Sequence, residues 1–175
     1  CEDLSGVSES QVEMNSGLQF FDGVTSDEIQ QILIKSASDL ISLENPNYQY
    51  VAARLLLFSL RKSLFHRLWE HPQLKEHINN CIDLGVYDKE FLKWYDDEEI
   101  NAMQDMIKHE RDYIFSYAGL RQVIDKYLVQ DRSSGQIFET PQFMYMMIAA
   151  TLFRNYDKDK RLSYVKKYYN AISQH

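Results

Sequence analysis

Residues 48–69 read YQYVAARLLLFSLRKSLFHRLW, with no internal glycine or proline. The apolar residues of this stretch, among them Val51, Leu55 and Leu56, recur at the spacing that places side chains on one face of a helix. Pro72 follows shortly afterwards and disfavours continuation of a helix. The stretch therefore predicts a long amphipathic helix.

The composition of the whole chain favours the same kind of structure. Of 175 residues, 45% are hydrophobic, and there are only 6 glycines and 3 prolines, so few positions interrupt a helix. Helical spacing, caps and breakers predict further helices at residues 26–40, 74–84, 97–108, 111–126, 142–154 and 157–172. We expect a mainly α protein.

One segment has the character of strands. Residues 127–132 and 136–139 flank Ser133-Ser134-Gly135, a pattern that is typical of two strands joined by a tight turn. We therefore expect one short β-hairpin near residues 127–139, within a fold that is otherwise helical.

Charge and cysteine content exclude several classes of protein. The formal net charge of -7 makes the chain a poor candidate for binding nucleic acid, which rewards positive surfaces. No apolar run approaches the length of a membrane span. The two cysteines, Cys1 and Cys81, cannot form a disulfide framework, so reduced thiols in a cytoplasmic protein are the expectation.

Residues that could carry chemistry have simpler structural interpretations. The histidines do not form a recognised metal-binding motif, and we expect core or solvated side chains; they are His66, His71, His77, His109 and His175. Residues 109–112, His-Glu-Arg-Asp, predict a salt-bridged turn at the surface. Cys81, between Ile78 and Ile82, is expected to be a small core residue. The residues alone therefore predict a helical protein without assignable catalytic chemistry.

Several segments together resemble one family. Residues 46–54, PNYQYVAAR, are similar to a segment of the large (alpha) subunits of class I ribonucleotide reductases, of the enterobacterial and T-even-phage type. Further similar segments follow in the family's order across the chain, and they are residues 22–27, 115–117, 126–129, 139–143 and 167–173. The resemblance covers essentially the whole sequence.

The resemblance implies a domain organisation. Residues 1–66 resemble the helical part of an ATP-cone, the regulatory module of these subunits, and residues 67–175 resemble their N-terminal helical domain. The β cap of the cone and the barrel that carries the catalytic cysteines have no counterpart in this sequence. No catalytic residue can be carried over, and we expect no metal site in this chain.

Three residues can be carried over to an allosteric site for ATP or dATP. Ser26 matches a hydroxyl residue at a helix N-terminus, where free N–H groups favour phosphate. Lys62 matches a lysine that reaches the phosphates. Gln30 stands where enterobacterial relatives have histidine, and this departure leaves the response to ATP versus dATP open. Without the β cap we expect the chain alone to bind no nucleotide tightly.

The implied function is allosteric nucleotide sensing and scaffolding for the reduction of ribonucleotides to deoxyribonucleotides. The implied partners are the barrel-bearing remainder of the large subunit and a diiron radical small subunit, in a homo-oligomeric holoenzyme. The isolated chain is expected to be inactive. The alternative is a non-enzymatic helical interaction module derived from this family, and downstream coding sequence for a barrel would distinguish the two.

Overall fold

The computed structural model describes residues 3–17, 19–65 and 70–174. Within these ranges the chain forms nine α-helices and one 3-10 helix (η1), and no β-strand, so the prediction of a mainly α protein is confirmed. No helix in these ranges is both long and apolar enough to cross a membrane. The helices are α1 (Glu9–Gly17), α2 (Ser26–Asp39), α3 (Tyr48–Phe65), α4 (Leu74–Asp83), α5 (Phe91–Trp94), α6 (Asp97–Met106), η1 (His109–Ile114), α7 (Tyr117–Lys126), α8 (Pro141–Phe153) and α9 (Lys158–Ser173).

Local sequence fixes where two of these helices begin. Before α2, the Thr25 side chain accepts the Glu28 N–H, and the Glu28 carboxylate accepts the Thr25 N–H at 2.8 Å. Asp96 and Glu99 form the same reciprocal pair before α6. Each pair satisfies two backbone donors that the first turn of a helix leaves free. These starts are encoded within four residues and need no tertiary contact.

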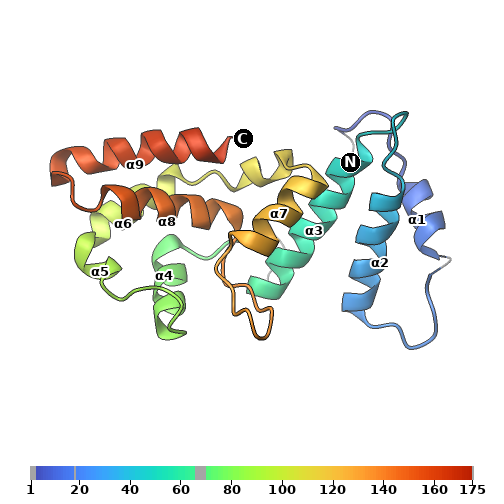
Figure 1. The fold of residues 1–175 in the computed structure, drawn as a ribbon, viewed down its shortest axis with the longest axis horizontal. Helices are drawn as coiled ribbons and strands as arrows, with labels where there is room; N and C mark the ends of the chain where they lie inside the picture. Colours follow the sequence, from blue (N-terminus) through green and yellow to red (C-terminus); the bar gives the residue numbers. More distant parts are fainter. Residues whose placement is uncertain (1–2, 18, 66–69, 175) are drawn as a thin grey trace.

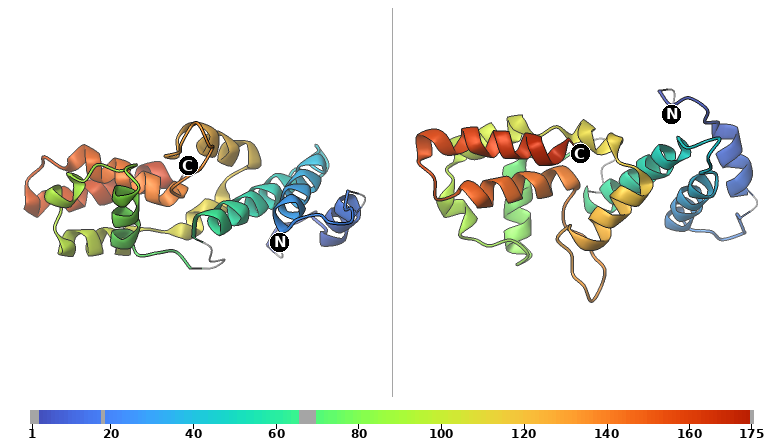
Figure 2. Two further views of the ribbon diagram at one scale, coloured as in Figure 1. Left: turned by 90° about the horizontal axis from the view of Figure 1, so that it is seen from below. Right: turned by 45° about the horizontal axis from the view of Figure 1, so that its top comes forward.

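The helices are arranged in an elongated molecule (Figure 1), with α1, α2 and α3 at one end and α8 and α9 at the other. α2 packs along α3, and α8 packs along α9. The two views of Figure 2 place α7 beside α3, in agreement with the contacts between these helices. α3 is therefore in contact with helices on both sides of the predicted domain boundary.

The apolar core is continuous along this arrangement. Ile34 of α2 and Leu57 of α3 belong to the same buried cluster as residues of α4 to α9. A smaller cluster, which includes Val12 and Tyr48, fastens α1 to α2 and α3. The predicted boundary between residues 66 and 67 lies outside the described residues, so the division into 1–66 and 67–175 stays a prediction.

The prediction of a β-hairpin near residues 127–139 is wrong. The described residues show one isolated antiparallel bridge, between Gln130 and Ile137, with no strand on either side. On one side the bridge does not extend because the Val129 N–H donates to the Glu139 carboxylate at 2.8 Å instead of to a facing carbonyl. On the other side the Asp131 carbonyl accepts the Gly135 N–H within the turn at 2.8 Å. The predicted turn is present. The Glu139 carboxylate, however, accepts the Val129 N–H that a second strand would otherwise accept.

The helix expected over residues 111–126 is divided into two. η1 ends at Ile114, and the Ser116 side chain then accepts the Gly119 N–H at 3.2 Å as the N-cap of α7. A serine side chain that accepts such a bond favours the start of a helix over its interior. The sequence prediction missed the cap because the apolar spacing continues through it.

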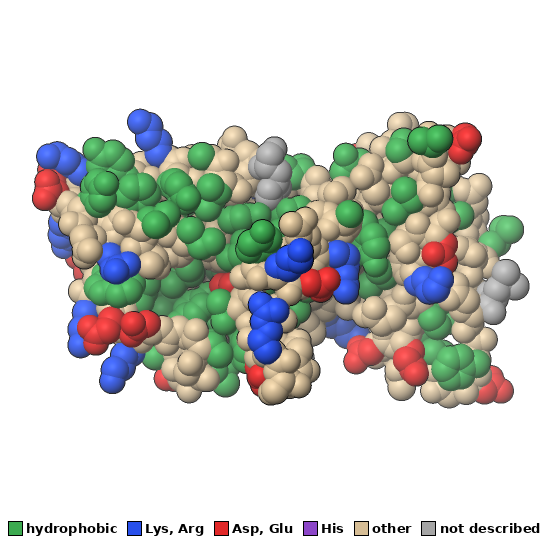
Figure 3. All heavy atoms as spheres, in the orientation of Figure 1, with side chains coloured by type: hydrophobic (Ala, Val, Ile, Leu, Met, Phe, Trp, Pro, Cys, Tyr) green, Lys and Arg blue, Asp and Glu red, His purple; other side chains and the backbone are tan. Residues whose placement is uncertain are grey.

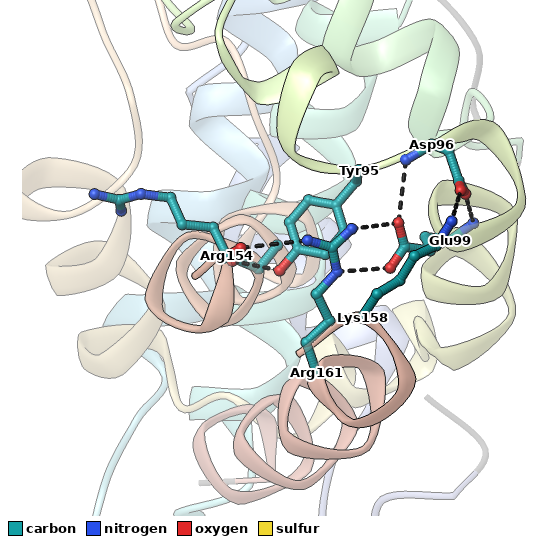
Figure 4. Close-up of polar contacts among 7 residues, drawn as sticks. Tyr95, Asp96, Glu99, Arg154, Lys158 and Arg161 are labelled. Carbon is teal, nitrogen blue, oxygen red and sulfur yellow. Dashed lines mark hydrogen bonds and ion pairs between the residues drawn. The ribbon is translucent and has the colours of Figure 1, made fainter. Parts of the chain in front are cut away.

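A buried ion pair joins α6 to α9 (Figure 4). Arg161 donates through Nε and Nη2 to the two Glu99 carboxylate oxygens at 2.6 and 2.5 Å. These side chains are 11% and 5% exposed, and the Arg161 guanidinium carbon lies 4.3 Å from the centre of the Tyr95 ring. Asp96 and Lys158 form a second pair at the exposed edge. The two-oxygen geometry fixes the orientation of α9 over α6.

We predict that Glu99→Gln will lower the free energy of unfolding by about 3 kcal/mol, because it leaves the Arg161 charge buried without its carboxylate. Urea unfolding followed by circular dichroism measures the loss. Lys158→Met is the matched control: it breaks the exposed pair with Asp96 and should change stability little. Equal losses in the two variants would contradict the assignment.

Candidate functional site

The predicted nucleotide-binding residues Ser26 and Lys62 meet at the N-terminus of α2. Ser26 is the first residue of that helix, and Lys62 lies in the last turn of α3. The Lys62 Nζ lies 3.5 Å from the Ser26 Oγ and 3.2 Å from the Asp27 carboxylate. The packing of α2 along α3 thus brings a cation to a helix N-terminus from a position 36 residues away in the sequence.

This arrangement has the chemistry of an anion site with a competing internal anion. The N-terminus of a helix carries free N–H groups and a partial positive charge, and Lys62 adds a full charge. In the structure, Lys62 forms an ion pair with Asp27, whose side chain is 90% exposed. The Glu28 carboxylate is held in the helix cap, and the hydrogen bonds from the Thr25 amide and hydroxyl lower its pKa. A phosphate that binds here would replace Asp27 as the partner of Lys62.

Gln30, the third predicted residue, has a different position. Its side chain is nearly buried at 9% exposure, and its Nε2 donates to the Leu55 carbonyl of α3 at 3.1 Å. Gln30 therefore ties α2 to α3. The structure brings Ser26 and Lys62 together, and whether the three residues bind a nucleotide stays a prediction.

Sequence reasoning missed a buried polar cluster around Asp112. Residues 109–112 were expected to form a surface turn, but Asp112 is only 1% exposed. Its carboxylate accepts hydrogen bonds from Arg61 at 3.3 Å and from Gln142 at 2.8 Å. Burial raises the pKa of Asp112 to about 6, against the opposing effect of these two donors. The sequence feature that could have indicated this cluster is Arg61, a charged residue in the otherwise apolar α3. A charged side chain that is buried needs a partner.

A second cluster lines a cavity of about 670 Å³ between the end of α3, α4 and residues 135–138. His77 and Cys81 stand four residues apart on α4, a pairing that sequence reasoning overlooked, with 3.7 Å between Cys81 Sγ and His77 Nε2. Burial lowers the pKa of His77 to about 4, and burial with the nearby Glu139 charge raises the pKa of Cys81 to about 12.

These pKa values indicate the protonation states of Cys81 and His77 near pH 7. A nucleophilic cysteine is a thiolate, and Cys81 beside a neutral His77 stays a thiol. Cys81 is 2% exposed, as expected for a core residue, and the His77 ring stacks on Phe143 with 4.2 Å between centroids. In the part of the chain that the structure describes, no group of three or more His, Cys, Asp or Glu residues could hold a metal ion.

The comparisons with known proteins agree with the sequence resemblance. A family model described as "Ribonucleotide reductase, all-alpha domain" matches residues 113–175. The chain is 48% identical over 172 residues to ribonucleoside-diphosphate reductase 1 subunit alpha of Salmonella typhimurium, and 46% identical over 172 residues to that of Escherichia coli. The chain corresponds to the N-terminal region of class I ribonucleotide reductase alpha subunits.

The matches cover nearly all of this chain but a small part of each relative. The two bacterial matches cover 98% of this chain but 22% of each relative. The alpha subunit of Enterobacteria phage T4 is 47% identical over 152 residues, which are 87% of this chain and 20% of the relative. The chain thus spans about a fifth of the length of these relatives, and their names as reductases describe the whole subunit.

The buried histidine gives a pH-dependent prediction. Because the pKa of His77 is lowered in the folded state, the unfolded chain takes up a proton below about pH 6.5 that the folded chain resists. Stability is therefore lost as the pH falls, and His77 accounts for about 2 kcal/mol between pH 7 and pH 5. His77→Gln should flatten the pH dependence of urea unfolding by that amount.

Other groups add to the pH dependence of the wild type. Burial is the largest cause that lowers the pKa values of His71 and His109, to about 4 and 3, so these act in the same direction. Asp112, with a raised pKa, acts in the opposite direction. All three remain in the variant, so the difference between the two curves reports His77 together with its effect on the neighbouring His109. Asn80→Ala, at an exposed position of α4, is the control, and parallel curves for His77→Gln and the wild type would contradict the prediction.

Proposed function

We propose that this chain is a regulatory and scaffolding segment of the large subunit of a ribonucleoside-diphosphate reductase. It senses ATP or dATP and supports the reduction of ribonucleotides, which is carried out by polypeptide with no counterpart here. The single observation that carries the proposal is the meeting of Ser26 and Lys62 at the N-terminus of α2, in a chain similar over 98% of its length to reductase alpha subunits.

The chemistry of this meeting point fits a nucleotide polyphosphate. Lys62 supplies charge compensation, and the first turn of α2 supplies the N–H donors that the Thr25–Glu28 capping pair does not use. The Lys62 side chain is 37% exposed, so a ligand can reach it. Gln30 lies about one turn further along α2 and holds the α2–α3 pair together. We assign these three residues to the effector site.

The proposed partners follow from the relatives. The chain associates with the remaining large-subunit polypeptide, which carries the catalytic barrel, and through it with a diiron radical small subunit in a homo-oligomeric cytoplasmic enzyme. Its proposed role is regulation and support, because the barrel of the remaining polypeptide carries the catalytic cysteines.

A second candidate is a non-enzymatic interaction module. It is favoured by apolar side chains that the fold leaves exposed, such as Ile148 and Leu152 on α8 and Tyr164 on α9, at 40%, 53% and 39%. Figure 3 shows hydrophobic side chains gathered over the part of this face that α8 and α9 form. Such a surface needs a partner under either proposal, and the partner's identity distinguishes them.

Reconstitution tests the proposal directly. The chain alone is expected to give no deoxynucleotide, whereas mixing it with the barrel-bearing remainder of the Escherichia coli relative and the diiron subunit should restore ribonucleotide reduction. Product formation measured by chromatography decides the outcome. Turnover by the isolated chain, or no binding to the remainder in a pull-down, would favour rejection of the reductase role.

The effector site has a prediction of its own. Lys62→Met should raise the ATP concentration for half-maximal effect on the reconstituted enzyme about tenfold, because one charge-assisted hydrogen bond to phosphate is lost. Lys35→Met is the matched control, since it removes a lysine of an exposed pair with Asp39 on α2. An unchanged ATP response in Lys62→Met would remove this residue from the effector site.

A further inference from the structure

Arg61 and Lys62 are neighbours on α3, but they face different parts of the molecule. Lys62 reaches the N-terminus of α2, and Arg61 reaches η1. Arg61 is 7% exposed and donates to the Tyr113 hydroxyl at 3.0 Å, the His109 carbonyl at 3.1 Å and the Asp112 carboxylate at 3.3 Å. One helical segment therefore carries both the cation of the proposed effector site and a buried cation anchored elsewhere.

A chain of buried hydrogen bonds runs onward from Arg61. The second Asp112 oxygen accepts from Gln142 of α8 at 2.8 Å, and the Gln142 carbonyl oxygen accepts from the Tyr169 hydroxyl of α9 at 2.6 Å. The Tyr169 oxygen in turn accepts the Lys108 N–H at 2.8 Å. Asp112, Gln142 and Tyr169 are 1% or less exposed, so water does not replace these bonds.

We infer that Arg61 is a positioning residue that couples the effector site at Ser26 and Lys62 to α9 through Asp112, Gln142 and Tyr169. The inference rests on the proposed function, since it assigns the regulatory output of the same site. It adds a route within this chain by which the bound effector alters the position of the last helix.

The physical reason is the cost of breaking a buried hydrogen bond. The terminal guanidinium nitrogens of Arg61 and the side-chain oxygens of Asp112, Gln142 and Tyr169 are paired, and a buried donor or acceptor left alone costs more than the bond itself contributes. In the proposed coupling, phosphate replaces Asp27 as the partner of Lys62, and this exchange shifts the end of α3 relative to α2. Arg61 moves with it, and the buried partners either follow or lose their bonds. The bond from Gln30 to Leu55 keeps the two helices in register further along.

The Lys108 amide is the reporter for this coupling, because its N–H is bonded to the last member of the chain. Its hydrogen exchange is measured by NMR on the isotope-labelled 175-residue chain, with and without millimolar Mg-ATP. The amide shifts of Ser26 and Lys62 report binding in the same sample. We expect Mg-ATP to change the Lys108 exchange rate by at least about threefold.

Two variants of Arg61 and one control define the route. Arg61→Met and the milder Arg61→Lys, which cannot bridge the three acceptors in the same way, should abolish or reduce the response at Lys108 while binding at Ser26 persists. Arg121→Lys is the control, because Arg121 pairs with Asp125 at an exposed position of α7 and should leave the response unchanged. Far-UV circular dichroism checks that each variant is folded, and Arg61→Lys decides the outcome if Arg61→Met is not.

The outcomes separate the two proposals. Binding at Ser26 with no change at Lys108, or a response that survives in both Arg61 variants, overturns the coupling and leaves the effector site intact. If no Mg-ATP binding occurs, the effector site fails for this chain, and Lys62→Met then tests the coupling without ligand. A changed Lys108 exchange rate in Lys62→Met supports the coupling, and an unchanged rate overturns it.

Discussion

The structure depends on the constraint that a charge removed from water must be paired. Arg61 and Asp112 bring η1 against α3, and Arg161 and Glu99 bring α9 against α6. Neither pair needs to add much net stability, because desolvation offsets most of the attraction. Their effect is on geometry: each allows few alternative packings, since sliding a helix would leave a buried charge alone. The apolar cluster supplies the driving force, and the two pairs select the arrangement.

The same constraint separates the effector end from the rest of the molecule. At the N-terminus of α2 the charges are exposed: Asp27 and Lys62 form a pair that solvent and ligands can reach. One residue away, Arg61 is buried and its two terminal guanidinium nitrogens donate to partners in η1. The ion pair that a ligand can replace therefore lies at the surface, and the ion pair between Arg61 and Asp112 lies in the interior. α3 joins the two because it packs against both α2 and α7.

The helical parts of the fold were predictable because their signals are local. Thr25 and Glu28 define the start of α2 within four residues, and Gly85, with a positive φ of 73°, follows the end of α4 at the expected place. The sequence could not show that the β-hairpin is absent, since the Glu139 carboxylate that accepts the Val129 N–H is buried beside Tyr87, 52 positions earlier. Similarly, nothing within residues 109–112 indicates that Asp112 turns inward to Arg61, a residue 51 positions earlier.

By itself, the sequence determined that the chain is helical, where most helices begin and end, and which family it resembles, because these depend on spacing, caps and ordered motifs along the chain. The resemblance also indicated Ser26 and Lys62 as candidate nucleotide-binding residues. Only the tertiary structure decided that these two side chains lie 3.5 Å apart, that Gln30 is turned towards α3, and that His77 and Cys81 are buried next to each other. The physical reason is that burial and pairing depend on which surfaces meet, and the energy of a charged or polar side chain is set by those neighbours.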